Sequence, residues 1–260
     1  MDKYIWIFPI LFIFHDMEEV IWLPGFIKNN REDIIKRYPI AEKLLSVYKN
    51  GMTTEAFALA VYEELVVLIA VCALNWITKA EWAMGIWYGA FIGFTAHLVI
   101  HILQSIAIKR YIPSLVTSIM TLPPSIMLLI NTKWDMSIYA TMSMIIGIVG
   151  VAANLKLAHM LMGWYDIRLK RRDQIRRIHK YEKIMHEAES MIEDPSEDET
   201  DSLCEKIKEL EAYYGSEDWK QDFSDDEAGL LPPDLNRGVL SEDGVYDLLE
   251  KYKEYQKMKA

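Results

Sequence analysis

Hydrophobic residues in the first 165 positions gather into five long stretches separated by short polar segments. The stretches cover approximately residues 4–26, 55–77, 82–108, 112–131 and 136–164. Each has about 20 residues or more, enough to cross a hydrocarbon core about 30 Å thick at about 1.5 Å per residue. A soluble bundle is disfavoured because stretches such as 136–153 contain no charge. The pattern predicts an all-α, polytopic membrane helical bundle of five spans.

Lysine and arginine in the connecting segments predict the orientation of this bundle. The 27–54 segment holds six of them, and IRLKRRDQIRRIHK after the fifth stretch holds seven bases against one acid. Because such bases concentrate on the cytoplasmic side, we expect a cell-membrane protein with its N-terminus outside and its C-terminus in the cytoplasm. The first stretch is expected to be a retained span rather than a cleaved signal peptide, since HDMEE at 15–19 interrupts its apolar run.

Charge divides the chain into two parts of different class. Residues 1–165 hold 12 acidic and 12 basic residues, whereas residues 166–260 hold 26 and 16. The net charge of −10 rules against general nucleic-acid binding, which needs an excess of Lys and Arg. We expect a transmembrane domain over 1–165, a basic juxtamembrane linker over 166–180 against the anionic inner leaflet of the lipid bilayer, and a small acidic cytoplasmic helical domain over 181–260.

Polar and ionisable residues interrupt the apolar stretches, although an ionisable one costs about 2.5–3.5 kcal/mol at the centre of a membrane helix. They are His15, Asp16, Glu18 and Glu19 in the first stretch, Glu63 and Glu64 in the second, His97, His101 and Gln104 in the third, and Asn154, Lys156 and His159 in the fifth. Counted from the expected cytoplasmic end of each span, they lie about 7–16 Å deep. The sequence therefore predicts one shared polar site slightly cytoplasmic of the bilayer midplane.

The spacing of these residues is typical of helical metal sites. His15 precedes Glu18 and Glu19 by three and four positions, and His97 precedes His101 by four, so that each set shares one face of a helix. Histidine and glutamate are ligands that suit Zn, Fe or Mn. We therefore expect these five residues to be the metal-ligand candidates. Adjacent glutamates on a helix point about 100° apart, so we do not expect Glu18 and Glu19 to bind the same ion together.

The other polar residues of the site have different expected roles. Glu63 and Glu64 are the candidates for a catalytic acid or base. Gln104, Asn154 and His159 would orient the ligands from outside the metal's coordination sphere.

Three functions stay open on these residues. The first is a membrane-embedded, metal-dependent enzyme that acts on a lipid-like substrate. The second is a proton-relay or transport protein that uses the same residues without a metal, as membrane Glu and His chains do. The third is a structural module, in which the polar residues only fix helix register and the acidic domain recruits a protein partner.

The order of these motifs resembles a known family. HDMEE, the EE of the second stretch, HLVIHILQ and KRYIPSLVTS are similar to the HXXEE-domain family of small bacterial membrane proteins, over about residues 5–163. The resemblance implies that His15, Glu18 and Glu19 are the signature of the family. It implies no substrate or activity.

Apolar positions at helical spacing recur in the acidic part. They predict helices over 175–193, 203–214 and 242–258, with a break at 194–202. Disorder is the rival interpretation for the break and for 215–230.

The end of the chain carries a second resemblance. The sequence from YYGSEDWKQDF at residue 213 to residue 254 is similar to the DUF4298 family of small acidic helical proteins, over about residues 178–258. This resemblance implies no catalytic residue.

Overall fold

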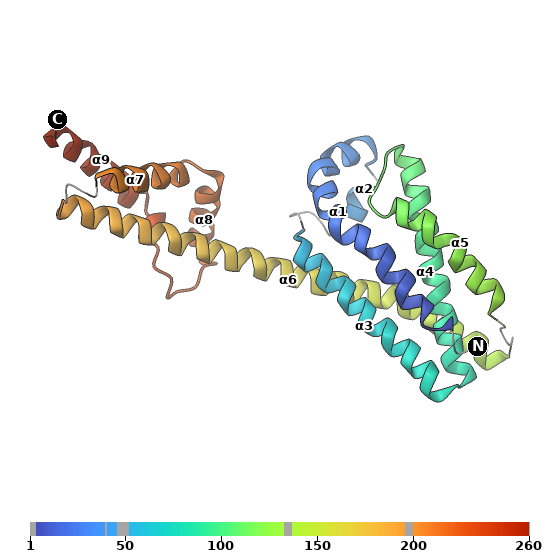
Figure 1. Ribbon diagram of the computed structural model, residues 1–260. Helices are drawn as coiled ribbons and strands as arrows, with labels where there is room; N and C mark the ends of the chain where they lie inside the picture. The colour runs from blue at the N-terminus through green and yellow to red at the C-terminus, as the bar shows by residue number, and fades with distance from the viewer. Residues whose placement is uncertain (1–3, 40, 46–51, 133–136, 196–199, 260) are drawn as a thin grey trace. The chain divides into compact units, whose positions relative to one another are not determined.

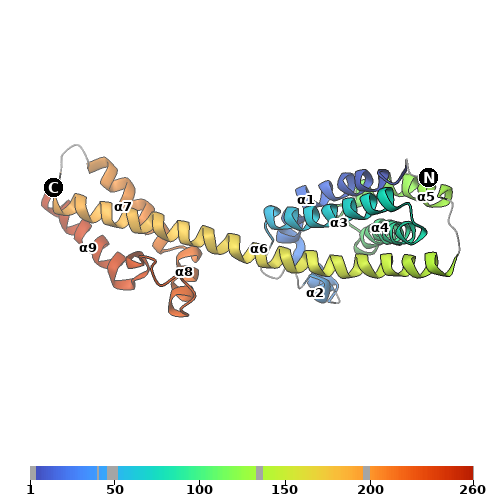
Figure 2. The same cartoon turned by 90° about the horizontal axis from the view of Figure 1, so that it is seen from below.

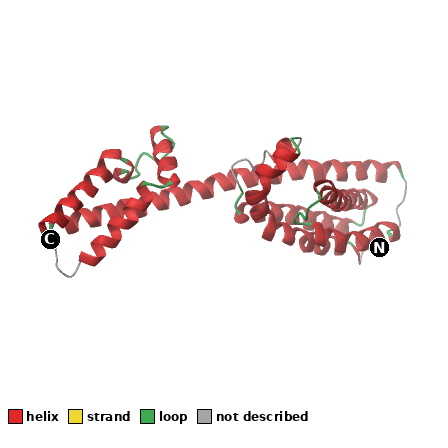
Figure 3. Ribbon diagram, turned by 90° about the horizontal axis from the view of Figure 1, so that it is seen from above, coloured by secondary structure: helices red, strands yellow, loops and turns green. Residues whose placement is uncertain are grey.

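A computed structural model describes residues 4–39, 41–45, 52–132, 137–195 and 200–259. Within these ranges the chain forms helices and no strand, which confirms the all-α prediction (Figure 3). The elements are α1 (Ile7–Arg37), α2 (Ala41–Leu44), α3 (Thr54–Thr78), α4 (Glu81–Ile108), α5 (Leu115–Asn131), α6 (Ile138–Glu193), α7 (Thr200–Tyr214), α8 (Glu217–Glu227), the 3-10 helix η4 (Gly238–Leu240) and α9 (Glu242–Lys259). The chain divides into two compact units, Met1–Ile167 and Arg168–Ala260.

The first unit is a bundle of α1, α3, α4, α5 and the first part of α6 (Figures 1 and 2). Three of these helices, α3, α4 and α6, are long and apolar enough to cross a membrane, and α5 is a shorter apolar helix. Large apolar side chains are exposed on their outer faces, among them Val66, Ile106 and Ile130. An apolar exterior of this kind is typical of a membrane protein.

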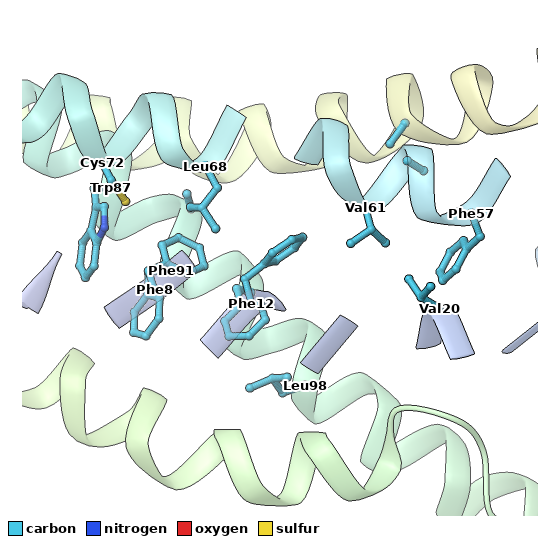
Figure 4. Close-up of a cluster of buried hydrophobic side chains, with 14 of the residues drawn as sticks. Phe8, Phe12, Val20, Phe57, Val61, Leu68, Cys72, Trp87, Phe91 and Leu98 are labelled. Carbon is cyan, nitrogen blue, oxygen red and sulfur yellow. The ribbon is translucent and has the colours of Figure 1, made fainter. Parts of the chain in front are cut away.

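Aromatic side chains fill the core of the first unit between α1, α3 and α4 (Figure 4). The ring of Phe8 contacts the edges or faces of Trp87 and Phe91, with centroids 5.9 and 4.7 Å apart. Leu68 of α3 and Phe12 of α1 belong to the same buried cluster. These contacts hold α1 against α4, so that residues further along both helices face one another.

Glycines allow α4 and α6 to approach closely. A Cβ atom added to Gly89 would lie 2.1 Å from the carbonyl oxygen of Met144, and one added to Gly147 would lie 2.3 Å from the carbonyl oxygen of Ile86. Both distances are shorter than any allowed contact, so the two backbones can pack this closely only through glycine.

Helix α1 is longer than the first predicted stretch. It continues beyond residue 26 to Arg37 and includes Pro24. Its extension buries Ile27 and Ile34, each 4% exposed, and most of its other residues are polar side chains that tolerate a helix. Much of the expected 27–54 connection is therefore helical.

The second unit contains the rest of α6 together with α7, α8, η4 and α9. Helices end at Glu193 and Tyr214 and begin at Glu242, which confirms the predicted helices of this part. The expected linker 166–180 is also helical, as part of α6. Helix α8 lies within 215–230, a segment for which disorder is the alternative prediction. Two contacts stabilise it: the Ser216 side chain caps its first turn, and the Trp219 ring donates to the carbonyl of Val239 at 2.9 Å.

A buried carboxylate joins three helices of the second unit. Asp222 of α8 is fully buried and accepts two hydrogen bonds from Arg177, at 2.6 and 2.8 Å. It also accepts from Gln174 at 3.0 Å and from the hydroxyl of Tyr213 at 2.7 Å. The partners come from α6 and α7, so this network fixes α8 to both helices.

Candidate metal site

Four side chains from α1 and α4 converge within the first unit. His15, Glu19, His97 and His101 each offer one ligand atom, and these atoms all lie within 4.8 Å of one another. The Nε2 atom of His101 lies 2.9 Å from Oε1 of Glu19 and 2.8 Å from Nε2 of His97. The Nε2 atom of His15 lies 3.9 Å from the same Glu19 oxygen. On each helix the two contributing residues are four positions apart, so that one face delivers both.

Two atoms at the centre of this group lack a hydrogen-bond partner among the described residues. They are Nε2 of His15 and Oε1 of Glu19, whose residues are 0% and 6% exposed. The Nε2 atom of His101 approaches the same Glu19 oxygen to 2.9 Å, close enough for the two atoms to share a proton or a metal ion. Because buried polar atoms are nearly always satisfied, two such orphans facing each other indicate an absent partner.

The proton on His15 is located by its neighbour Thr117 of α5. The hydroxyl oxygen of Thr117 lies 2.6 Å from the Glu18 carboxylate, which can only accept, so the hydroxyl donates there. The same oxygen therefore accepts from Nδ1 of His15, 3.1 Å away. With its proton on Nδ1, His15 presents the lone pair of Nε2 to the group.

His101 of α4 is held by Gln104, whose side-chain oxygen lies 3.2 Å from its Nδ1. Its Nε2 atom faces both the Glu19 oxygen and Nε2 of His97. The lone pair of His15 and the Glu19 carboxylate oxygen face each other without a hydrogen-bond partner among the described residues, and a cation between them would satisfy both. The donor set thus fits a metal ion.

Glu18 on α1, a predicted metal ligand, and Gln104 on α4, a predicted orienting residue, lie beside the group. Glu18 lies outside it and accepts hydrogen bonds from Thr117 and from the hydroxyl of Tyr111, the latter at 2.5 Å. Burial and this bond to Glu18 raise the pKa of Tyr111 to about 12, so that Tyr111 remains a donor at neutral pH. Gln104 contacts His101 directly.

The predicted residues of α3 and α6 are placed differently. The amide of Asn154 donates to Glu63 at 3.3 Å, and Glu64 faces a cavity. The ring of His159 contacts the carbonyl of Leu155 at 2.7 Å and lies outside the group of four. The structure therefore gathers the residues of α1 and α4 at one point and leaves those of α3 and α6 at the wall of the bundle.

The cavity has a volume of about 700 Å³ and is lined by α1, α3, α4 and α6. Most of its lining is apolar. Its polar lining residues are Asp16, Glu64, His97 and Asn154. His97 belongs to both the group of four and the cavity wall, so a molecule in the cavity would reach the candidate metal site.

Sequence reasoning did not single out Thr117 or Tyr111, and it gave Asp16 no role of its own in the site. Asp16 lies inside the HDMEE motif, and Tyr111 and Thr117 lie inside KRYIPSLVTS. A signal was therefore present for all three, but their contacts depend on how α5 packs on α1.

Comparison with known families agrees with both resemblances. Residues 6–128 match a family model described as a protein of unknown function with HXXEE motif, and residues 178–259 match a domain of unknown function, DUF4298. The first match ends at residue 128, within α5, and so includes no part of α6. In the HXXEE motif the His and the two Glu are His15, Glu18 and Glu19. No curated protein and no solved structure matches the chain.

Proposed function

We propose that this protein, which carries an HXXEE domain followed by a DUF4298 domain, is a metal-dependent membrane enzyme that acts on a lipid-like substrate. The observation that carries the proposal is the convergence of His15, Glu19, His97 and His101, whose ligand atoms all lie within 4.8 Å of one another, with Nε2 of His15 facing the Glu19 carboxylate.

The donor set suits Zn, Fe or Mn, because it combines imidazole nitrogen with carboxylate oxygen and contains no thiolate. Four protein ligands would fill a tetrahedral zinc site, whereas an octahedral ion would keep two positions for substrate. Catalysis at this site therefore favours Fe or Mn over Zn. The ion would act as a Lewis acid on a polar group of the substrate.

Residues of the cavity wall supply the remaining functions. Glu64 faces the cavity and is the proposed acid or base, while Glu63 is held by Asn154. Thr117 and Glu18 hold His15 in the tautomer that can bind a metal. An apolar cavity that reaches His97 suits a lipid-like substrate.

Metal analysis of the full-length protein, purified in detergent without chelator, tests the proposal. We expect about one equivalent of a transition metal in the wild type, and its loss in Glu19→Gln and His101→Ala. The matched controls, Glu32→Gln on α1 and His179→Ala on α6, should keep the metal. A wild type without stoichiometric metal would instead support a proton relay or transport protein on the same residues.

The proposed topology has five spans, formed by α1, α3, α4, α5 and the first part of α6, in a cell membrane. The N-terminus is outside and the DUF4298 domain is in the cytoplasm, on the evidence of the Lys and Arg distribution. In a cysteine-free background, a membrane-impermeant maleimide should label Ala80→Cys in intact cells. It should label Glu32→Cys and His179→Cys only after permeabilisation. Equal labelling of all three in intact cells would contradict this orientation.

A further inference from the structure

The cavity of the first unit is polar at one end and apolar at the other. On α1, α3 and α4 respectively, the apolar end is lined by Phe8, Val71 and Ile86. The polar end is lined by Asp16, Glu64 and His97 of the same three helices. Because α3 runs antiparallel to α1 and α4 (Figure 1), the three polar residues meet at the same end. At about 1.5 Å per residue, the eleven positions from Ile86 to His97 give the cavity a length of about 16 Å.

One oxygen atom of a buried carboxyl at the polar end lacks a hydrogen-bond partner among the described residues. Asp16 is 5% exposed, it lines the cavity, and its Oδ2 atom has no hydrogen-bond partner among the described residues. Glu64 lines the same cavity, and none of the described lining residues is Lys or Arg. A buried carboxyl costs free energy unless it is paired or hydrogen-bonded, so the polar end is built for a ligand that brings a cation or donors.

The cavity opens onto the apolar exterior of the bundle. Val67, Ile100 and Leu157 line it and are also 39%, 49% and 47% exposed. In a bilayer these side chains would face lipid, so a ligand can enter sideways from the membrane and keep its apolar chain out of water.

We propose that this cavity binds a single-chain amphiphile with a primary ammonium head, which pairs with Asp16 and Glu64 while the chain fills the apolar end toward Phe8. The charges favour this head over an anionic one. An anionic head would lie against two carboxyl groups with no Lys or Arg among the described lining residues, whereas an ammonium head can donate to both carboxyl groups. This substrate class rests on the proposed function for turnover, but binding does not need the metal.

Three probes of equal chain length test the head group: dodecylamine, dodecanol and laurate, added to full-length protein in nanodiscs of zwitterionic lipid. Native mass spectrometry and thermal shift should show dodecylamine bound at least tenfold more tightly than either of the others. Equal or tighter binding of laurate would overturn the proposal. So would a second equivalent of metal that disappears in Asp16→Asn, because the carboxyls would then hold an ion.

Variants locate the binding. Asp16→Asn and, independently, Glu64→Gln should weaken dodecylamine binding at least tenfold, whereas Glu32→Gln on the exposed part of α1 should not change it. Val71→Trp, which fills the apolar end, should abolish binding, and Val66→Trp, on the exposed face of the same helix, should not. Unchanged binding in both Asp16→Asn and Val71→Trp would overturn the assignment to this cavity.

The metal-ligand variants separate this proposal from the proposed function. His101 does not line the cavity, so His101→Ala should lose the metal and still bind dodecylamine. A wild type without metal that binds dodecylamine through Asp16 would contradict the proposed enzyme and support the amphiphile site. A wild type that holds the metal but does not discriminate among the three probes would support the proposed enzyme and contradict the amphiphile site.

Discussion

The Nδ1 atom of His15 lies 3.1 Å from the hydroxyl oxygen of Thr117, a residue 102 positions further along the chain. Through this contact α5, which contributes no residue to the group of four, determines which nitrogen of His15 faces the metal site. Replacing Thr117 by Val keeps the shape of the side chain and removes its hydrogen bonds. Because partners of this kind hold a ligand's orientation and tautomer, we expect metal affinity to fall about 10–100-fold in Thr117→Val.

Competition with a chromophoric chelator measures this change. Thr117→Ser, which keeps the hydroxyl, is the matched control and should retain the wild-type affinity. If Thr117→Val also retains it, the contact between Thr117 and His15 has no part in metal binding.

The close approach of α4 and α6 predicts a packing defect that depends on position. In Gly147→Ala the added methyl group would lie 2.3 Å from the carbonyl oxygen of Ile86, so the two helices must move apart. Overpacking of this kind costs about 1–3 kcal/mol of folding free energy. At Gly163 of the same helix an added Cβ meets no atom within 4 Å, and Ala there should be neutral or stabilising by up to about 1 kcal/mol.

Thermal unfolding in detergent, followed by circular dichroism, compares the two variants. Gly147→Ala should melt below the wild type and Gly163→Ala at or above it. Equal melting temperatures for both variants would show that the glycine contact does not limit the packing of α4 on α6.

The core of the second unit includes residues of the predicted linker, 166–180. Ile178 is fully buried there, and Arg177 and Gln174 hold Asp222. A fragment that begins at residue 181 would lack these partners and leave the buried Asp222 carboxylate without its cation, which costs about 3–5 kcal/mol. We therefore expect residues 168–260 to fold as a cooperative unit and residues 181–260 to be unfolded.

Urea denaturation of the two fragments, followed by far-ultraviolet circular dichroism, tests this expectation. The 168–260 fragment should show one sigmoidal transition. A cooperative transition of similar midpoint in the 181–260 fragment would show that Gln174, Arg177 and Ile178 are dispensable.

The sequence was sufficient to predict the parts of the site that depend on one helix. The i, i+4 spacing of His15 with Glu19 and of His97 with His101 follows from helix geometry alone, and both pairs meet in the structure. The apolar pattern likewise predicted where α3 lies, since a long apolar stretch bounded by polar residues has few alternatives in a membrane.

The rest depends on contacts between helices that are distant in sequence. Glu18 and Glu19 are adjacent residues of the same type. The packing of α5 on α1 brings Thr117 to Glu18, and the packing of α4 on α1 brings His101 to Glu19. Helix α8 was missed for a related reason. Its charged sequence lacks a strong apolar stripe, and burial of Trp219 and Asp222 against other helices holds it in place.

The hydroxyl of Tyr213 donates to Asp222, and this contact predicts a pH dependence in the second unit. Burial and the neighbouring Asp222 carboxylate raise the pKa of Tyr213 above its ordinary value of 10.0. A raised folded-state pKa contributes stability that is fully present below pH 10 and is lost as the pH rises toward the folded-state pKa, since the unfolded chain releases its proton first. At pH 8 the Tyr213→Phe variant of the 168–260 fragment should be less stable by about 1.5–3 kcal/mol, the loss of a hydrogen bond to a charged group.

This stability gap between the wild type and Tyr213→Phe should shrink as the pH rises from 10 to 12, because only the wild type has the phenol that titrates at this position. Urea titrations of both fragments at pH 8, 10, 11 and 12 measure it, and groups common to both cancel in the difference. Tyr246→Phe, at an exposed position of α9, is the matched control and should leave both the stability and its pH dependence unchanged. A gap that stays constant or widens above pH 10 would mean that the Tyr213 hydroxyl is not held as a buried donor to Asp222.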